Sequence, residues 1–365
     1  MRVIRALIAV LLLVWGPPVL AQEPLRVHFF DVGQGDAVLI QSPSGQNVVY
    51  DGGERATAML EYLQRVGVSQ IDLVIASHNH ADHIGGLTEV LRQFRPRFYL
   101  DNGIPATTLT YRRLLEAVQA AGTQLLEPTA RRISVGEVSL VVLPPPGIAS
   151  WEQNDNSVGI VLEYGSFRLS LAGDAEGRQW GWWLQRQGAQ FGKVHVHKAS
   201  HHGSRNGDTA AGIARLSPEV VIVSAGLRNS YGHPALDALR LYAGEGATVY
   251  RTDLHGTVVV EAEPSGRYTV HVERGEGARP PTPAPPAATT AIPAPQPPST
   301  ACVDINTANA TELQQILHIG AERAQQILTL RRQRPFGSVN ELTRVNGIAA
   351  ARLRDILAQG LACVR

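Results

Sequence analysis

The chain has 365 residues, of which 18% are charged and 44% are apolar, and its formal net charge is +1. This composition is that of an ordinary globular protein with two or three domains, and it excludes a chain that is mostly disordered. The small net charge does not by itself identify a polyanionic partner.

The first 21 residues have the pattern of a secretory signal peptide. Arg2 and Arg5 precede the apolar stretch "ALIAVLLLVW", and small residues precede a predicted cleavage after Ala21. This apolar stretch is shorter than the ~20 residues that span a bilayer, although an uncleaved membrane anchor is the alternative. We therefore expect a secreted, periplasmic or cell-envelope protein with no stable membrane span after cleavage.

Residues 22–274 alternate short apolar runs with glycine-rich turns, which predicts a layered α/β domain. In the first half, the expected strands are 25–33, 36–45, 47–53 and 71–78, followed by helices at 85–94 and 110–122. In the second half, the expected strands are 157–165, 168–174, 193–204, 219–226 and 257–263. Strands in both halves with helices between them indicate two packed sheets covered by helices.

The stretch "SHNHADHIGG" follows an apolar run and places His78, His80, Asp82 and His83 within six residues. Imidazole and carboxylate groups bind zinc and also accept manganese or iron. The spacing lets His78 and His80 face one ion while Asp82 and His83 face a second. The alternative is a polar turn with capping residues. Three protonated histidines this close would repel one another, so a metal ion is the natural reason to gather them.

The motif "HNHADH" resembles the signature of the metallo-β-lactamase fold, which implies an αββα sandwich with a one- or two-metal site between its sheets. The blocks "FFDVGQGDAVLIQSPSGQNVVYDGG", "SHNHADHIGGL", "LAGDAE", "KASHHGS" and "YGHP" resemble, in the same order, the extracytoplasmic hydrolase domain of the DNA-uptake protein ComEC. The resemblance covers residues 25 to 262 and leaves out the membrane channel of that family. It therefore implies a free, secreted relative.

The same resemblance implies roles for later residues. Asp174 in "AGDAE" matches a carboxylate that bridges two metals, and His202, or else its neighbour His201, matches a later ligand of the second site. His233 in "YGHP" matches a position at the mouth of the site that faces the substrate. Lys198 could contact a phosphate or lie solvated at the surface. The resemblance also matches loop positions around the cleft to Asp31, Gln34, Asp36 and Asp51. Whether these four residues have structural or catalytic roles is left open.

Two positions depart from the family pattern. The generic fold supplies another histidine upstream of the bridging aspartate, whereas this chain has Asn156 there, as ComEC relatives tend to. Asparagine is a weak ligand, so we expect the first site to bind its ion loosely or to be completed by water. Many ComEC relatives have aspartate where this chain has His80, which brings the first site closer to the general two-metal pattern.

Two divalent ions, zinc or manganese, would supply the chemistry of this site. A bound zinc lowers the pKa of its water from 15.7 to about 7, and two ions ~3.5–4 Å apart neutralise charge on the oxygens of a phosphodiester. The residues expected to take part in catalysis are Asp82, Asp174, His233 and Lys198. β-Lactam hydrolysis uses the same hydroxide, so the motif alone does not select a substrate.

Residues 275–300 contain nine prolines and few charges, which predicts an extended spacer. The spacer separates residues 22–274, with a net charge of −4, from a tail, residues 301–365, with a net charge of +3. Cys302 and Cys363 bracket the tail. In an oxidising compartment, this pair favours a disulfide over two free thiols.

In the tail, "INTANATEL", "ILHIGAERA", "RPFGSVNEL" and "VNGIAAARL" resemble the paired helix-hairpin-helix module of the competence DNA receptor ComEA, a small all-α domain. Each hairpin turn of that module presents backbone N–H groups at a helix N-terminus to a DNA phosphate, without reading base sequence. The resemblance points to Gly320 and Gly347 in the turns and to nearby arginines that include Arg323 and Arg352. Each hairpin has lost one glycine of the expected Gly-apolar-Gly pattern, and protein contacts are the alternative role.

Both parts resemble components of bacterial DNA uptake. The sequence therefore predicts an exported, metal-dependent phosphodiesterase or nuclease that acts on DNA, with a tail that holds the duplex backbone. Two alternatives stay open, a non-catalytic DNA-binding protein of the cell surface and a hydrolase of a cell-wall phosphodiester. The sequence does not identify protein partners.

Overall fold

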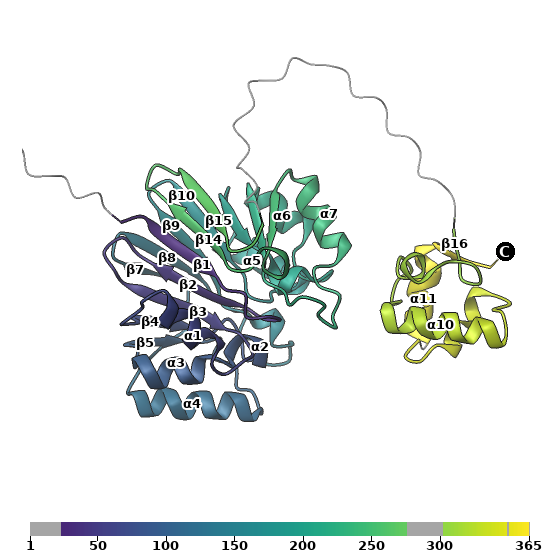
Figure 1. Cartoon of the computed structure of the whole chain (residues 1–365), viewed down its shortest axis with the longest axis horizontal. Helices are drawn as coiled ribbons and strands as arrows, with labels where there is room; N and C mark the ends of the chain where they lie inside the picture. Colours follow the sequence, from purple (N-terminus) through teal and green to yellow (C-terminus); the bar gives the residue numbers. More distant parts are fainter. Residues whose placement is uncertain (1–22, 276–301, 349, 365) are drawn as a thin grey trace, which may run out of the picture. The chain divides into compact units, whose positions relative to one another are not determined.

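The computed structural model describes residues 23–275, 302–348 and 350–364, which form two compact units on either side of the gap at 276–301 (Figure 1). The predicted signal peptide lies outside the described residues, and so does the predicted spacer apart from Gly275. Within the described ranges, no helix combines the length and apolar character needed to cross a bilayer.

Two β-sheets form the centre of the first unit. The strands of one sheet are β1 (Leu25–Phe29), β2 (Ala37–Gln41), β3 (Asn47–Gly52), β4 (Leu73–Ile75), β5 (Phe98–Leu100), β6 (Gln124–Leu126), β14 (Val258–Ala262) and β15 (Tyr268–Val272). The strands of the other sheet are β7 (Arg131–Val135), β8 (Val138–Leu143), β9 (Gly159–Tyr164), β10 (Phe167–Leu171), β11 (Val196–Lys198), β12 (Val220–Val223) and β13 (Thr248–Arg251).

The two sheets have matching topologies. The first has the strand order β15-β14-β1-β2-β3-β4-β5-β6, and the second has β13-β12-β11-β10-β9-β8-β7. In the first sheet the pairs from β15 to β3 are antiparallel and those from β3 to β6 are parallel. In the second sheet the pairs from β13 to β10 are parallel and those from β10 to β7 are antiparallel.

Side-chain alternation along the strands explains why the sheets pack on both faces. In β2, Val38 and Ile40 point into the core between the two sheets, while Leu39 points to the opposite face and packs under helices. The same period of two places Leu169 of β10 in the core between the sheets. Because both faces of the central strands are covered, these strands are almost continuously apolar.

Helices cover the two outer faces. The helices of this unit are α1 (Ala58–Arg65), α2 (Ala81–Ile84), α3 (Leu87–Phe94), α4 (Leu109–Ala121), α5 (Gly177–Arg186), α6 (Ala210–Leu216), α7 (Leu236–Gly244) and α8 (Thr252–His255). The helices α1, α3 and α4 pack on the first sheet, and α5, α6 and α7 pack on the second (Figure 1). This four-layer arrangement confirms the predicted αββα fold class.

The predicted element boundaries differ from the observed ones in specific places. The strand expected over 193–204 is only Val196–Lys198, because a turn that contains Ser200–Gly203 follows it. The helix expected over 85–94 begins at Leu87 and is preceded by the separate short helix α2. The helices α5, α6 and α7 are absent from the prediction, and α5 owes its position to Trp180 and Trp183, which fill the core under the second sheet.

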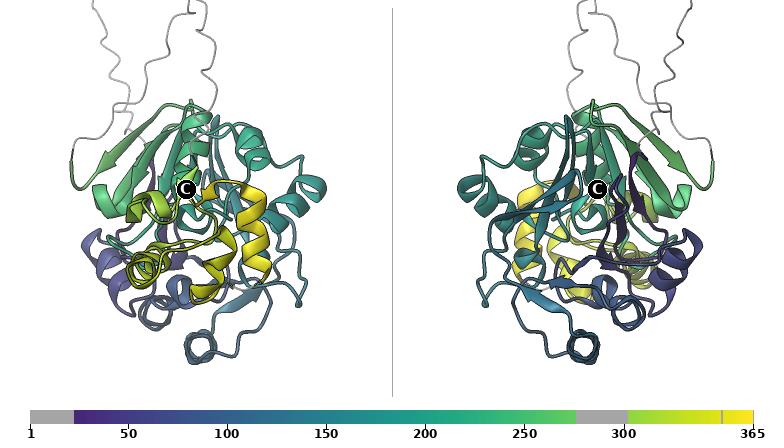
Figure 2. Two further views of the ribbon diagram at one scale, coloured as in Figure 1. Left: turned by 90° about the vertical axis from the view of Figure 1, so that its right-hand side faces the viewer. Right: turned by 90° about the vertical axis from the view of Figure 1, so that its left-hand side faces the viewer.

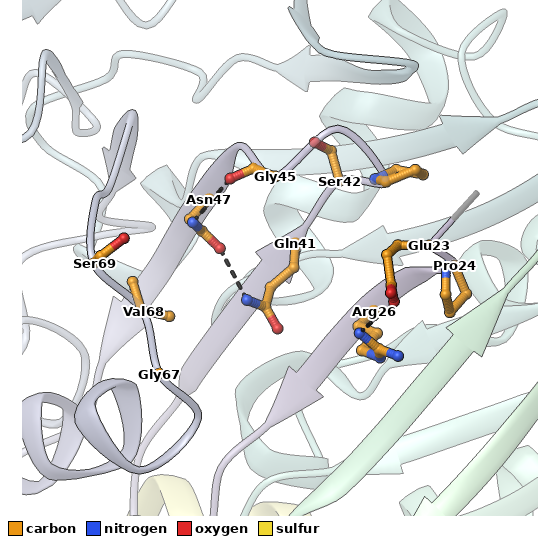
Figure 3. A pocket seen from close by; sticks show the side chains of 11 residues that line it. Glu23, Pro24, Arg26, Gln41, Ser42, Gly45, Asn47, Gly67, Val68 and Ser69 are labelled. Atoms are coloured by element: carbon orange, nitrogen blue, oxygen red, sulfur yellow. Dashed lines mark hydrogen bonds and ion pairs between the residues drawn. The ribbon is translucent and has the colours of Figure 1, made fainter. Parts of the chain in front are cut away.

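A polar pocket of about 350 Å³ opens at one end of the first sheet (Figure 3). It lies where β1 and β3 begin and β2 ends, and its lining includes Arg26, Gln41 and Asn47. The strand β4 runs parallel to β3 and leads into the histidine-rich loop at the opposite end of the sheet, so this pocket is separate from the predicted metal site.

The second unit is a small helical module, as predicted (Figure 2, yellow-green to yellow). Its elements are β16 (Val303–Asp304), α9 (Ala310–Leu313), α10 (Ala321–Gln333), a 3-10 segment (Val339–Arg344), α11 (Ala350–Gln359) and β17 (Ala362–Cys363). Ile305, Ile327, Phe336 and Ile356 belong to its own apolar core. The strands β16 and β17 pair in parallel, and a disulfide joins Cys302 to Cys363 beside them.

Candidate metal centre

The candidate ligands stand on loops that follow strands of both sheets. In the first sheet, β4 leads into the segment 77–83. In the second sheet, β10 leads to Asp174, and β11 leads to His201 and His202. The loops meet at one edge of the sandwich, where ligands commonly bind in layered α/β folds. Residues separated by more than ninety positions in the sequence thereby come into contact.

One carboxylate oxygen, Oδ2 of Asp174, lies at the centre of the site. It is 3.2 Å from His83 Nε2, 3.4 Å from His202 Nε2, 3.7 Å from His201 Nε2 and 4.0 Å from His78 Nε2. The main-chain N–H of Asp174 donates to the hydroxyl oxygen of Ser157 at 3.2 Å, which helps to fix the loop that carries Asp174. Four imidazoles therefore surround a single carboxylate, in keeping with its expected bridging position.

Asp82 completes a compact group of ligand atoms. Its Oδ2 lies 3.2 Å from His202 Nε2 and 3.9 Å from His83 Nε2. The residues whose ligand atoms all lie within 4.8 Å of one another are Asp82, His83, Asp174 and His202. Two carboxylates and two imidazoles form a donor set that zinc and manganese both accept.

Carboxylates hold the two buried imidazoles of this group from behind. His83 Nδ1 is 2.9 Å from Asp51 Oδ2. His202 Nδ1 is hydrogen-bonded to the main-chain carbonyl oxygen of Ser224 at 3.1 Å, and Asp36 Oδ1 lies 3.1 Å from the same nitrogen. Asp51 is itself fixed because the main-chain N–H and the hydroxyl of Ser77 each donate to it at 2.7 Å. Histidines that bind metals commonly donate their outer N–H to a carboxylate, which turns the other nitrogen toward the ion.

The electrostatics of the group favour positive charge at its centre. Burial alone would lower the pKa of His83, but the carboxylates of Asp174 and Asp82 raise that pKa well above its ordinary value. Burial also opposes charge on His202, whose pKa Asp174 and Asp36 raise well above its ordinary value. Both imidazoles thus lie among carboxylates that favour a positive charge at this point, and a bound metal ion would supply one.

Unpartnered polar atoms also point to a missing cation. Within the described residues, His83 Nε2, His202 Nε2 and Asp174 Oδ1 are buried and have no hydrogen-bond partner. Leaving a buried polar group unsatisfied costs ~1–3 kcal/mol, and a coordinated ion would remove that cost. The residues of this group therefore fit a divalent metal ion.

The predicted first ion has a less complete ligand set. His78 is buried, and its Nε2 lies 3.0 Å from Nδ1 of the exposed His80, which stands just before α2. The prediction that Asn156 is a weak ligand does not fit the structure. The Asn156 amide donates to the carbonyl oxygens of Ile148 and Glu152 and accepts the main-chain N–H of Ile148, so it holds a loop instead.

Lys198 needs a further correction, because it neither lies at the surface nor faces a position open to a phosphate. Its side chain is fully buried at the end of β11, and Nζ donates to Oδ2 of the equally buried Asp36. Burial would raise the pKa of Asp36, but Lys198 and His202 keep it below its ordinary value. Lys198 thus acts as a counter-charge to the carboxylate that lies beside His202.

His233 lies at the rim of the group, where the sequence placed it. Its ring stacks on Tyr231 at 5.7 Å between centroids and approaches the rings of His201 and His202 at 5.5 and 6.1 Å. Burial, together with the charges of His202 and His201, lowers the pKa of His233 to about 4. Near neutral pH this imidazole is uncharged and can donate or accept one hydrogen bond.

Of the other loop positions that the sequence singled out, two have structural contacts. Asp31 Oδ2 accepts from Arg274 at 2.8 Å, and Gln34 Oε1 accepts the main-chain N–H of Gly226 at 3.2 Å. The sequence assigns no role to Glu176, yet its Oε1 lies 3.1 Å from His201 Nδ1. Its position two residues after Asp174 in "AGDAE" is the signal that could have drawn attention to it.

In the helical module, the predicted DNA-contact residues surround two turns. Arg323 donates to the carbonyl oxygen of His318 at 3.0 Å and to that of Asn346 at 3.1 Å, so it connects both hairpins. Arg352 donates to the carbonyl oxygen of Gly347 at 2.6 Å. Both arginines therefore brace the turns, a structural role that the sequence did not indicate.

The two turns differ in how they use glycine. Gly347 has a φ of +80°, and a Cβ built there would lie 2.8 Å from the Arg323 guanidinium. His318 takes the equivalent first position of the other hairpin with a φ of +63°, a conformation that costs less for glycine. Gly320 has an ordinary negative φ and open space around it. The first hairpin therefore keeps its turn although its first glycine is lost.

The model of the metallo-beta-lactamase superfamily matches residues 30–226, which is more than half of the chain. The chain belongs to the metallo-β-lactamase superfamily. Residues 299–358 match the model of the helix-hairpin-helix motif. The two matches confirm the resemblances on which the predicted architecture rests, a metallo-hydrolase fold joined to a helix-hairpin-helix module.

Several characterised proteins are similar to parts of this chain. ComE operon protein 3 of Bacillus subtilis is 26% identical over 66% of this chain and 33% of its own length. Recombination protein 2 of Haemophilus influenzae is 27% identical over 66% of this chain and 29% of its own length. A protein named deoxyribonuclease from Thioalkalivibrio is 41% identical over 17% of each chain. The chain thus spans about a third of the length of its competence and recombination relatives.

Proposed function

We propose that this chain is an exported, metal-dependent phosphodiesterase that cleaves DNA. The observation that carries the proposal is the group formed by Asp82, His83, Asp174 and His202, in a chain that also has a helix-hairpin-helix module. The resemblance to competence proteins and to a protein named deoxyribonuclease supports DNA as the substrate. The signal-like first 21 residues support export.

When bound, divalent ions supply a hydroxide at neutral pH and neutralise charge on the phosphate oxygens. The chain's own residues have separate tasks. Asp82 and Asp174 provide negative ligand atoms, while Asp51 and Asp36 orient the imidazoles of His83 and His202. Zinc and manganese both suit this donor set.

The rim of the site offers contacts to a nucleic acid. His233, uncharged near neutral pH, can donate a hydrogen bond to a phosphate oxygen. The ring of Tyr231 lies next to it and is 70% exposed, so a base can stack on it. Stacking tolerates any base, which agrees with a nuclease that does not read sequence.

The helical module would hold the duplex by its phosphates. Turns at Gly320 and Gly347, braced by Arg323 and Arg352, precede the helices α10 and α11. Helix N-termini favour anions because their N–H groups and their dipole both attract negative charge. Binding of this kind raises the concentration of DNA near the metal site without new contacts there, and it weakens as salt increases.

The experiment compares cleavage of supercoiled plasmid by the mature chain, by Asp82→Ala and by Asp237→Ala, with zinc or manganese added after chelation. Asp237 is an exposed aspartate outside the metal group and provides the control. We expect the chain and the control to cut DNA. Asp82→Ala should lose at least the ~10–100-fold in rate that removal of an outer partner of a metal ligand typically costs, because Asp82 is itself in the ligand group. Intact plasmid with the metal-loaded chain under all these conditions would reject the proposal.

A second candidate, a non-catalytic DNA-binding protein, is favoured by one observation, the engagement of Asn156 in loop contacts instead of the first metal site. Plasmid that is bound but never cut would identify this function. Hydrolysis of a cell-wall phosphodiester predicts a different result. Removal of residues 301–365 would leave that activity unchanged, whereas DNA cleavage would fall at moderate salt.

A further inference from the structure

The first ion of the predicted pair lacks a third imidazole from the usual segment of the chain. His78 and His80 are adjacent, with 3.0 Å between their nearest ring nitrogens. Asn156, which takes the place of the missing histidine, uses both ends of its amide to bind main-chain groups. A strong site for this ion therefore needs a nitrogen ligand from elsewhere.

His201 lies where such a ligand is needed. Its Nε2 is 3.7 Å from Oδ2 of Asp174, the same oxygen that is 4.0 Å from Nε2 of His78. The main-chain N–H of His201 donates to the carbonyl oxygen of Gly173 at 3.0 Å, which ties this residue to the loop of Asp174. Among the described residues, His201, His78 and His80 all lie outside the compact group formed by Asp82, His83, Asp174 and His202, so an ion held by these three imidazoles would have to draw them closer together.

A carboxylate stands behind His201, as it does behind His83 and His202. His201 Nδ1 lies 3.1 Å from Glu176 Oε1, and Glu176 also accepts from the side-chain amide of Asn154 at 3.1 Å. This arrangement turns Nε2 toward the centre of the site, and it is the one that metal-binding histidines commonly have. Three of the imidazoles around Asp174 thus have a carboxylate oxygen within 3.1 Å of Nδ1.

The backbone at this position is strained in a way that serves the site. His201 and His202 have φ values of +47° and +55°, in the left-handed region that side chains other than glycine rarely adopt. Strain of this kind persists only where the surrounding structure demands it. Here it directs two consecutive imidazoles at the same carboxylate, which an extended strand would send to opposite faces.

We propose that His201 is the third imidazole of the first ion, with His78 and His80, and that Glu176 orients it. Asp174 would then offer its carboxylate both to this ion and to the one that Asp82, His83 and His202 would hold. The inference rests on the proposed metal-dependent function, but it concerns metal binding and is tested without DNA. Three imidazoles and a carboxylate form a nitrogen-rich donor set that suits zinc.

The test counts bound ions and measures their affinities in the full mature chain. Chelated protein is titrated with Co²⁺ by calorimetry and absorption, and zinc retained after dialysis is measured by elemental analysis. The variants are His201→Ala and Glu176→Gln, with His271→Ala as the control because His271 is an exposed histidine on β15. Thermal unfolding in chelator shows whether each variant folds.

We expect two ions in the unmodified chain and in the control, and one ion in His201→Ala. Glu176→Gln should keep both ions but bind the weaker one about 10–100-fold less tightly, as expected for loss of an outer partner. Two ions with unchanged affinities in His201→Ala would overturn the inference, and so would a single ion in both the unmodified chain and this variant. If His201→Ala loses one ion while the two-ion chain never cuts DNA, the proposed function fails and the ligand assignment stands.

Discussion

Replacing Lys198 with methionine removes the ammonium group that faces Asp36. Both side chains are fully buried, and the two are joined by a short hydrogen bond between Nζ and Oδ2. Asp36 keeps His202 as a neighbour at 3.1 Å, but it loses its permanently charged partner. Removing one partner of a buried ion pair typically costs ~3–5 kcal/mol, because the remaining charge stays out of water.

The corresponding change in melting temperature can be estimated from the size of the unit. For a unit of ~150–250 residues, each kcal/mol shifts the melting temperature by ~2–4 °C, so Lys198→Met should lower it by about 6–20 °C. The assay is calorimetric unfolding of the full chain at pH 7 in chelator, so that bound metal does not contribute. The double variant Asp36→Asn with Lys198→Met should regain at least half of the loss, because it leaves no unpaired charge.

A decrease of less than about 2 °C in Lys198→Met, below the effect of ~1 kcal/mol, would refute this reasoning. A lysine that contacts substrate phosphate predicts a different pattern. Its loss would raise the KM for DNA and leave the melting temperature unchanged. The two roles are therefore separated by one stability measurement and one kinetic measurement.

Three further predictions concern other parts of the chain. Burial would raise the pKa of Asp208, but His197 lowers it below its ordinary value. The negative charge of Asp208 therefore stabilises the folded chain above about pH 4, and this stabilisation is lost as the pH falls through the folded-state pKa. Asp208→Asn should lower the melting temperature at pH 7, with a difference from the unmodified chain that shrinks below pH 4. Gly347→Ala should destabilise the helical module by at least ~1 kcal/mol in calorimetry, because its φ is +80°, while Gly320→Ala should change it little. Tyr231→Ala should weaken binding of single-stranded DNA by about 5–100-fold, because stacking of a base on an aromatic ring contributes ~1–3 kcal/mol, and it should leave metal binding unchanged. Equal affinities of Tyr231→Ala and the unmodified chain for single-stranded DNA would exclude a stacking role.

The sequence predicted much of the fold because its signals are local. Apolar runs in β1 to β4 identify strands whose two faces are both buried, and the "HNHADH" motif identifies four neighbouring site residues. Asp174 and His202 could be placed only through the family resemblance. Nothing in their own segments indicates that Oδ2 of Asp174 lies 3.2 Å from Nε2 of His83 and 3.4 Å from Nε2 of His202.

The sequence did not predict the roles of Lys198, Asn156 and His201, because those roles depend on contacts with other parts of the chain. Lys198 is 162 positions from Asp36, and a lysine that ends a short strand looks exposed until its buried acidic partner is known. Asn156 resembles a weak ligand by position alone, but three short contacts to a nearby loop decide its role. The left-handed conformation of His201 follows from tertiary packing and has no local signal in the histidine pair.

The origin of the ligands has a consequence for the stability and lifetime of the protein. Asp82 and His83 lie in α2, which follows a strand of one sheet, while Asp174 and His202 follow strands of the other. A bound ion therefore joins the two halves of the sandwich, as a reversible cross-link would. At a free metal concentration 100 times the dissociation constant, such a link adds ~2.7 kcal/mol to the stability of the folded state. Scarcity of metal would then expose the chain to proteolysis as well as silence it, so that the amount of protein follows the supply of its cofactor.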